Sequence, residues 1–372
     1  MKRVDADVLI VGGGGAGCSA ALHLAERGSR VVLLERGLVG SQATGVNYGG
    51  VRQQGRHPAE LPIARRSRVL WGRMKAWLGT DAEFRPTGHL KLARSAAEED
   101  DLVAYLDVAR QHELPLTLFR RAELHQAYPW LGPGVVAGSL ADDDGCANPR
   151  LLAPALAEAA RRAGADIREN APARSWTGTA HRFEICTDDA QFTAPVLINT
   201  AGFWGGAIAE SFGEPVPCTP LSPNMIVTEP LPYFIVPNLG VVGGDIYLRQ
   251  TERGNVVLGG GRGEYDAEQA WSRPLPEVTL AGMRRALFLV PSLAQAQIIR
   301  TWSGIDGGMP DKIPVLGPSK TTPGLFHAFG FSGHGFQLGP AIGGILSELV
   351  LDGKTDIELE AFRPDRFNGA SP

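Results

Sequence analysis

The chain lacks the features that mark several large classes of protein. Its 372 residues include four cysteines, Cys18, Cys146, Cys186 and Cys218, and none of them forms a C-x-x-C pair. This spacing supports neither a zinc site nor an iron–sulfur cluster nor a disulfide framework, so we expect no bound metal. No apolar run approaches the roughly 18 residues that a membrane-spanning helix needs, so we expect no membrane span.

Positive charge is also scarce. The formal net charge is −4, which argues against nucleic acid as a partner. The first apolar run follows Asp5 and Asp7 and ends in glycines within a few residues, unlike a secretion signal. We therefore expect a cytoplasmic protein. We find no internal repeat, low-complexity segment or long linker, and the length predicts about two domains.

Glycine, in contrast, is abundant, and its 47 residues gather in a few runs. The first run follows the apolar "DVLIV" of residues 7–11, which is typical of a buried parallel strand. Residues 16–28 have a helical pattern ending at Gly28, and residues 29–35 read as a second strand. The glycines therefore lie at the first turn of a βαβ unit.

The glycines match G-x-G-x-x-G at Gly12, Gly14 and Gly17. The first allows a tight turn, the second lets a pyrophosphate approach the backbone, and the third lets the helix pack closely on the strand. The helix N-terminus, with Ala16, then binds the phosphates. Glu35, at the end of the second strand, can accept both hydroxyls of an adenosine ribose. The alternative is a structural glycine turn with no ligand.

A second strand–glycine turn–helix unit closes the chain. "LFHAFG" reads as a strand, "FSGHGFQLG" as a turn, and residues 340–353 as a helix with Pro340 in its first turn. A helix N-terminus is a positive pole. A reduced flavin ring carries negative charge that this pole stabilises, whereas NAD has no such need. The unit therefore favours FAD, and a ligand-free turn is the alternative.

Two central segments extend the same sheet. "VLINTAGFWGG", within residues 194–206, reads as a buried strand followed by a cofactor-facing loop that includes Ala201 and Gly202. Residues 145–170 supply a helix and a further strand.

These motifs together resemble the D-amino-acid oxidase-like superfamily of FAD oxidoreductases, which includes glycine oxidase and sarcosine oxidase. The resemblance rests on "DVLIVGGGGAG", "NYGGVRQQ", "VLINTAG", "MPDKIPVLG" and "GFSGHGFQLGPAIG", in the family order. "SGIDGGMPDKIPVLG" and "GGVRQQGRHP" resemble more closely the flavin subunits of opine oxidase, D-hydroxyproline dehydrogenase and hydrogen cyanide synthase.

The resemblance implies an α/β fold in which a Rossmann-like FAD-binding domain is interleaved with an antiparallel-sheet α+β substrate domain. The FAD domain would comprise residues 1–90, 145–215 and 305–372, and the substrate domain residues 91–144 and 216–304. Short β-like runs set off by Pro and Gly in residues 216–304 agree with this division.

The resemblance also implies an activity. Relatives oxidise the C–N bond of an amino acid or secondary amine by hydride transfer to flavin N5, which gives an imine. Residues assigned to the cofactor on this basis and from the motifs are Gly12, Gly14, Ala16, Gly17, Glu35, Arg36, Gly49, Gly50, Val51, Ala173, Ala201, Gly202, Gly333, His334, Gly335, Phe336 and Gln337.

The candidates for contact with the substrate are Arg52, Tyr247, His334 and Asp306. Arg52 matches a substrate- or flavin-facing arginine of sarcosine-oxidase-like relatives, and a guanidinium binds a carboxylate in a two-pronged way. Arg56 is a second possibility in that stretch, and a surface ion pair is the alternative role for either arginine. Tyr247 would share a strand face with Arg249, toward either the pocket or solvent. His334 lies in the glycine turn, where a hydrogen bond to flavin or substrate and a plain turn role both stay open.

The sequence departs from its relatives at three positions. Gln337 stands where sarcosine-oxidase-like relatives have a lysine that contributes to oxygen activation. Asp306, the fourth candidate, stands where glycine-oxidase-like relatives have a carboxylate-binding arginine, and its alternative role is to cap the Gly307-Gly308 turn. Gly304 stands near the cysteine that binds flavin covalently in sarcosine oxidases, so we expect non-covalent FAD.

Three functional classes follow. The first is an FAD-dependent amino-acid or amine oxidase or dehydrogenase, as a single chain or homo-oligomer. The second is the flavin subunit of a heteromeric dehydrogenase that passes electrons to partner chains. The third, a flavin-dependent hydroxylase, is disfavoured by the "PDKIPVLG" and "SGHGFQLGP" segments. The amine itself and the electron acceptor stay open.

Overall fold

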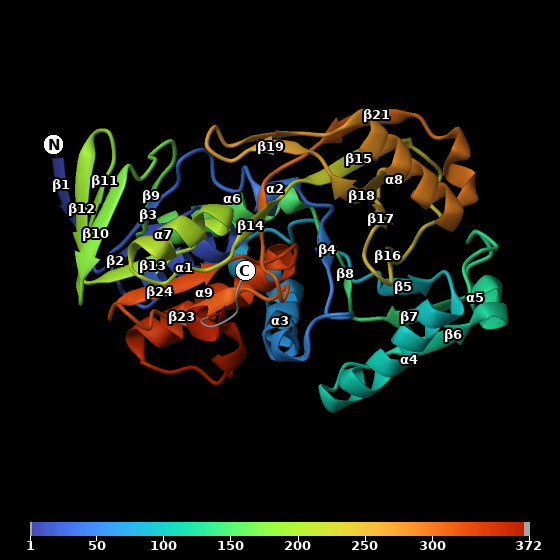
Figure 1. Cartoon of the computed structure of the whole chain (residues 1–372), viewed down its shortest axis with the longest axis horizontal. Helices are drawn as coiled ribbons and strands as arrows, with labels where there is room; N and C mark the ends of the chain where they lie inside the picture. Colours follow the sequence, from blue (N-terminus) through green and yellow to red (C-terminus); the bar gives the residue numbers. More distant parts are fainter. Residues whose placement is uncertain (1, 368–372) are drawn as a thin grey trace.

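A computed structural model describes residues 2–367, and residues 368–372 of the expected C-terminal FAD segment lie outside it. Two large sheets lie at opposite ends of its long axis (Figure 1). Within residues 2–367, no helix is both long and apolar enough to cross a membrane.

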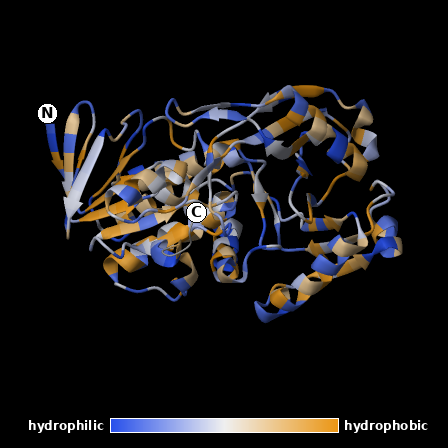
Figure 2. Cartoon of the chain, in the orientation of Figure 1, coloured by the Kyte–Doolittle hydropathy of each residue, from blue (hydrophilic) through white to orange (hydrophobic). Residues whose placement is uncertain are grey.

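The first large sheet has six strands, and all neighbours pair in parallel except β23 with β24. In spatial order they are β23 (Val315–Pro318), β24 (Leu325–Phe329), β13 (Val196–Asn199), β2 (Val8–Val11), β3 (Val31–Leu34) and β9 (Asp166–Arg168). Strands β2 and β3 are buried along their whole length, as expected when both faces are covered. These strands carry mostly the hydrophobic colour (Figure 2).

Helices pack on one face of this sheet, and a smaller sheet packs on the other. Val8, Ile10 and Leu33 pack on α1 (Gly15–Glu26), α6 (Pro149–Arg162), α9 (Gly335–Leu351) and α3 (Leu61–Leu78). Leu9 and Leu34 point to the other face, because side chains alternate along a strand. There they pack on a four-stranded sheet of β1 (Lys2–Asp5), β12 (Ala190–Ala194), β11 (Arg182–Cys186) and β10 (Ser175–Thr179).

Helix α9 corrects one expectation. It begins at Gly335, so Pro340 lies inside the helix and not in its first turn. The interior proline removes one backbone amide from the ladder, but tertiary contacts hold the helix against α1. Ser19 Oγ donates to the Pro340 carbonyl at 2.8 Å. A Cβ at Gly343 would lie 2.2 Å from the Ser19 backbone, so only glycine permits this approach. The helix N-terminus consequently lies at the glycine turn itself.

The second large sheet has eight strands. In spatial order they are β21 (Ile298–Trp302), β15 (Pro223–Pro230), β18 (Asn255–Arg262), β17 (Tyr247–Gln250), β16 (Asn238–Val241), β5 (His89–Ala93), β7 (Ala137–Ala141) and β6 (Thr117–Arg120). Helices α8 (Pro276–Leu289), α4 (Ala96–Gln111) and α5 (Arg121–Ala127) accompany it. The expected antiparallel sheet contains one parallel pair, β16 with β5. Segments far apart in sequence meet there, and a parallel pair cannot be joined by a short hairpin.

Three short two-stranded pairings lie outside the larger sheets. Strand β4 (Gly50–Val51) pairs with β8 (Gly145–Cys146), β14 (Thr219–Leu221) pairs with β22 (Asp306–Gly308), and β19 (Glu264–Asp266) pairs with β20 (Trp271–Arg273). The remaining helices within residues 2–367 are α2 (Ala43–Val46), α7 (Gly205–Ser211) and short 3-10 turns, including η1 (Pro58–Glu60) and η2 (Gly202–Trp204). The expected α/β fold class is confirmed. The division into two discontinuous domains stays our proposal, and its boundary after residue 90 falls inside β5.

Candidate active site

A cavity of about 830 Å³ runs between the two large sheets. Its walls include the turn after β2, the N-terminus of α9, and strands β5 and β17. This volume lies within the usual range of cofactor and ligand sites. The cavity therefore brings together residues from segments that are hundreds of positions apart in the sequence.

The first glycine turn forms one end of the cavity. Gly12 has φ +107, and a Cβ there would lie 2.4 Å from the Thr200 carbonyl oxygen. A Cβ at Gly17 would lie 2.0 Å from the Gly12 carbonyl oxygen. Gly14 is the N-cap of α1 and lines the cavity with Gly12 and Ala16. This bare backbone at a helix N-terminus is suited to a pyrophosphate.

Glu35 and Arg36 line the cavity beside that turn. Glu35 accepts hydrogen bonds from the Gly13 and Gly37 amides at 2.7 and 2.8 Å. The Arg36 guanidinium lies 3.5 Å from the centroid of the Trp204 ring, and its buried Nη2 has no hydrogen-bond partner within residues 2–367. A buried donor without an acceptor is costly. Arg36 is therefore suited to an acceptor on a bound ligand, and Ala173, Ala201 and Gly202 line the cavity nearby.

The N-terminus of α9 forms another part of the wall. Gly333, His334, Gly335 and Phe336 all line the cavity. The backbone turns sharply there, with Ser332 at φ +53 and Gly333 at φ +84. The first amides of the 17-residue helix, which have no partner inside it, therefore lie at the cavity. This is the arrangement expected for a site that stabilises an anionic ring.

All four expected substrate-contact residues, Arg52, Tyr247, Asp306 and His334, line the cavity. Arg52 Nη1 donates to the Gln54 carbonyl at 2.7 Å. Burial raises the pKa of the Tyr247 phenol, so the phenol keeps its proton. The Tyr247 ring packs against Tyr48 with centroids 4.6 Å apart. Arg249, on the same strand, is buried and donates to the Tyr48 carbonyl, so it positions Tyr48 and does not line the cavity.

Asp306 lines the cavity and also caps a turn. One carboxylate oxygen accepts from the Gly307 amide at 2.9 Å, and the other accepts from the Gly333 amide at 2.7 Å. The carboxylate thus ties β22 to the turn that begins α9. Burial raises its pKa to about 6, against the opposing effect of these two amides. Capping, expected as the alternative role, is therefore present in the geometry.

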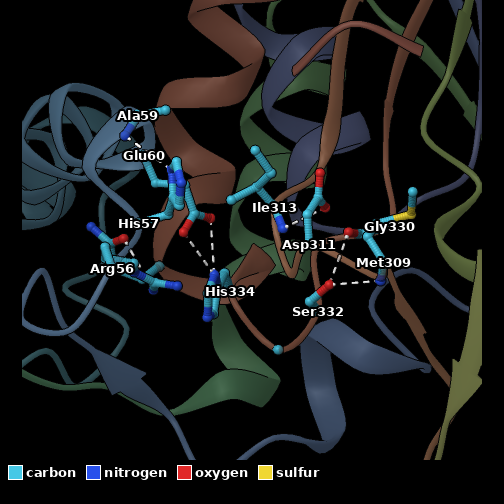
Figure 3. A network of polar contacts seen from close by, with 12 residues as sticks. Arg56, His57, Ala59, Glu60, Met309, Asp311, Ile313, Gly330, Ser332 and His334 are labelled. Atoms are coloured by element: carbon cyan, nitrogen blue, oxygen red, sulfur yellow. Dashed lines mark hydrogen bonds and ion pairs between the residues drawn. The ribbon is translucent and has the colours of Figure 1, made fainter. Parts of the chain in front are cut away.

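His334 is held by a buried carboxylate. Its Nδ1 lies 2.9 and 3.0 Å from the two oxygens of Glu60, which is fully buried (Figure 3). Burial alone would raise the pKa of Glu60, but His334, Arg56 and Arg52 outweigh burial and lower it. Burial, together with the Arg56 and Arg52 charges, lowers the pKa of His334 to about 4. The pair is thus a neutral imidazole that donates Nδ1–H to a carboxylate.

Four residues assigned to the cofactor do not line the cavity: Gly17, Gly49, Val51 and Gln337. Gly17 packs closely against the Gly12 carbonyl. The Gly49 carbonyl accepts from the Ala147 amide, and Val51 pairs with Gly145. Gln337 is fully buried; its amide nitrogen donates to the Ala64 carbonyl at 2.8 Å, and its oxygen accepts from Arg56 at 3.4 Å. Gln337 therefore holds α9 to α3 and steadies Arg56.

The cavity also includes residues that the sequence did not single out, among them Tyr48, His89, Lys91 and Trp204. His89 and Lys91 occupy alternate positions of "HLKLA" in β5, opposite the buried Leu90 and Leu92. This alternation is a signal that could have identified them. Glu60 carried no such signal, because only tertiary packing brings η1 to His334.

Residues 7–349 match the model of the family "FAD dependent oxidoreductase". Glycine oxidase of Geobacillus kaustophilus is 28% identical over 98% of this chain and 97% of its own length. Hydrogen cyanide synthase subunit HcnC of Pseudomonas aeruginosa is 26% identical over 97% of this chain and 96% of its own length. The structure of L-proline dehydrogenase from P. horikoshii superposes with a TM-score of 0.90 at 27% identity, covering 99% of this chain and 98% of that one.

The chain belongs to the FAD dependent oxidoreductase family, and it is an enzyme whose cofactor is FAD. It spans less than half of some relatives, 44% in the case of dimethylglycine dehydrogenase of Mus musculus.

The cavity fits the cofactor: Gly12 and Gly14 provide a bare cradle, Arg36 has a free buried donor, and α9 begins at the cavity. These residues would hold the pyrophosphate, the adenosine and the flavin ring, respectively.

Proposed function

We propose that this enzyme oxidises the C–N bond of an amino acid or secondary amine to an imine. The observation that carries the proposal is a cluster of three cations, Arg52, Arg56 and Lys91, that lines the cavity. Within residues 2–367, none of the three has a carboxylate oxygen within 4.0 Å of its charged nitrogens. Arginine is well suited to a carboxylate. The carboxylate of a bound amino acid would contact this cluster, and its amino group would lie in the part of the cavity next to it.

The same cations suit the chemistry. A positive environment disfavours an ammonium ion, so a bound amine is kept neutral with its lone pair free. The packed rings of Tyr48 and Tyr247 form an aromatic part of the cavity wall. FAD, when bound, supplies the two-electron acceptor. Within residues 2–367, no group of three His, Cys, Asp or Glu side chains is placed to hold a metal ion.

The relatives support a carboxylate-bearing substrate. Glycine oxidase and L-proline dehydrogenase are named for amino acids, one with a primary and one with a secondary amine. The sequence differs from both by more than two thirds of the aligned positions, so the amine must be found by experiment.

The test is an anaerobic screen. The FAD-loaded chain is mixed under nitrogen with amino acids, N-methyl amino acids, prolines and opines, and loss of the flavin absorbance near 450 nm is followed (about 450 nm is the usual flavin maximum). We expect bleaching by at least one carboxylate-bearing amine and none by the matching amine without a carboxylate. Bleaching by alkylamines alone would contradict the proposal.

The second candidate is the flavin subunit of a heteromeric dehydrogenase. The similarity to HcnC, which is named as a subunit, favours it. So does Gln337, which is neutral and faces α3 instead of the cavity. Turnover of the purified chain with a dye acceptor, but not with oxygen, would support the subunit; equal turnover with oxygen would support a self-sufficient oxidase.

A further inference from the structure

Lys91 lines the cavity but has no role in the interactions described above. It lies on β5, in the eight-stranded sheet, and not in the sheet that carries the glycine turns. Its ammonium lies over the Tyr105 ring, 5.7 Å from the centroid. Within residues 2–367 it has neither a hydrogen bond nor an ion pair, although it is partly buried. Burying an ammonium group without a hydrogen-bond acceptor or a counter-ion costs free energy, and a bound anion would offset that cost.

Lys91 and Arg52 converge on one point. A Cβ built at Gly55, which has φ +74, would lie 3.0 Å from Lys91 Nζ and 3.7 Å from Arg52 Nη1. Both cations therefore approach the same bare stretch of backbone, which lines the cavity. A side chain at position 55 would crowd both of them. The third cation, Arg56, is 2% exposed and keeps Nη1 without a partner.

Two nearby acidic side chains are already engaged. Asp144 accepts from the Gln53 and Gln54 amides at 2.7 and 3.0 Å. Glu60 is bound to His334. Asp101, on α4, is exposed and forms no ion pair with Lys91 within 4.0 Å. His89 adds no charge, because burial first and the neighbouring cations second lower its pKa far below the usual range.

One carboxylate does not use all of these donors. A single guanidinium already engages both oxygens of a carboxylate. Arg52 and Arg56 belong to the loop between β4 and η1, whereas Lys91 projects from β5. With the two guanidinium groups available for the substrate's α-carboxylate, the Lys91 ammonium is left for a second anionic group.

We propose that Lys91 binds a second carboxylate of the substrate, so that the enzyme acts on dicarboxylic amino acids or amines. This inference rests on the proposed function and narrows it to one substrate class. Lys91 would set specificity, and it would not take part in breaking the C–H bond.

The first test compares matched substrates. The FAD-loaded enzyme is assayed with sarcosine against N-(carboxymethyl)glycine, and with N-methylalanine against N-methylglutamate. We expect kcat/KM to favour a dicarboxylate in at least one pair. Lys91→Met should reduce that preference by about tenfold to a hundredfold, mainly through KM, as expected for loss of a charge-assisted contact. Lys91→Arg should retain most of it. The matched control is Lys75→Met, an exposed lysine on α3, which should leave the preference unchanged.

A second test needs no turnover. Calorimetric titration of the FAD-loaded enzyme with glutarate and with pentanoate compares two and one carboxylates on chains of equal length. We expect glutarate to bind more tightly, and Lys91→Met to remove the difference. Equal binding of both acids to the native enzyme, or a difference that survives Lys91→Met, overturns the inference. If no amine bleaches the flavin but glutarate binds through Lys91, the proposed function fails while the dicarboxylate site stands.

Discussion

Nδ1 of His334 lies 2.9 Å from Oε1 of Glu60, and this contact joins the N-cap of α9 to η1 before α3. The carboxylate is fully buried, and its charge is balanced by Arg56 and Arg52 as well as by the imidazole hydrogen bond. The contact fixes Nδ1 as the protonated nitrogen, so Nε2 of a ring that lines the cavity carries a lone pair.

Glu60→Gln should destabilise the protein by about 1–3 kcal/mol, because it removes a buried charge that offsets Arg56 and weakens the acceptor of the His334 hydrogen bond. Chemical denaturation of the FAD-loaded protein measures the loss. The control is Glu113→Gln, which breaks the exposed pair with Arg65 and should cost no more than about 0.5 kcal/mol. Equal losses in the two variants would show that Glu60 does not stabilise this region electrostatically.

The preference for a second carboxylate should fall as the pH rises through about 8. Burial, followed by the Arg52 charge and against the opposing Asp101 charge, lowers the pKa of Lys91 to about 8. The ammonium needed for anion binding is thus present below that pH and lost above it. The pH profile of kcat/KM, which reports the free enzyme, should show this decline for the dicarboxylate. In Lys91→Arg the decline should be absent, because arginine stays charged.

Arg52→Lys should weaken apparent substrate binding by roughly 1.5–3 kcal/mol, because lysine cannot make the two-pronged contact. The FAD content should not change if Arg52 holds the substrate. The absorbance ratio of flavin to protein measures FAD content, and steady-state kinetics measures binding. A colourless variant would instead place Arg52 on the cofactor, and unchanged kinetics would remove it from the site.

Asp306→Asn should change how stability depends on pH. The raised pKa of about 6 means that the native state holds the Asp306 proton more tightly than the unfolded chain does. The wild type therefore loses stability relative to Asp306→Asn as the pH rises from about 4 to about 6, with a constant difference above that. Over this pH range, the difference in the free energy of unfolding between the two proteins should change by about 2–3 kcal/mol. We also expect lower activity of the variant on the true substrate and slow native turnover of glycine. A stability difference that does not depend on pH would contradict the raised pKa of Asp306 in the folded protein.

FAD should be released by acid precipitation, leaving a colourless pellet and a yellow supernatant. By the resemblance, the attaching cysteine of sarcosine-oxidase-like relatives falls near Gly304. A Cβ there would lie 2.2 Å from the Val46 side chain, so the position has no room for a thiol. A yellow pellet would show covalent attachment elsewhere, with His89 and His334 as the histidines that line the cavity.

The sequence by itself determined the fold class and the cofactor. The strand, glycine turn and helix around Gly12 and Gly17 follow local rules, since a tight turn and a close helix packing each require a missing Cβ. The second glycine turn at Gly333 indicated a flavin by the same kind of reasoning. Local spacing was enough here because the interacting groups are near one another in the chain.

Only the tertiary structure decided the composition of the substrate end. Lys91 and Arg52 lie on different elements, and nothing in their spacing shows that they meet at Gly55. Glu60 and His334 are 274 positions apart. Pro340 was expected in the first turn of α9, but the helix begins at Gly335 and contains the proline. Packing against Ser19 compensates for the cost of a proline within the helix. Burial, charge balance and the pKa values that follow from them are set by contacts between distant segments, and no local pattern encodes those contacts.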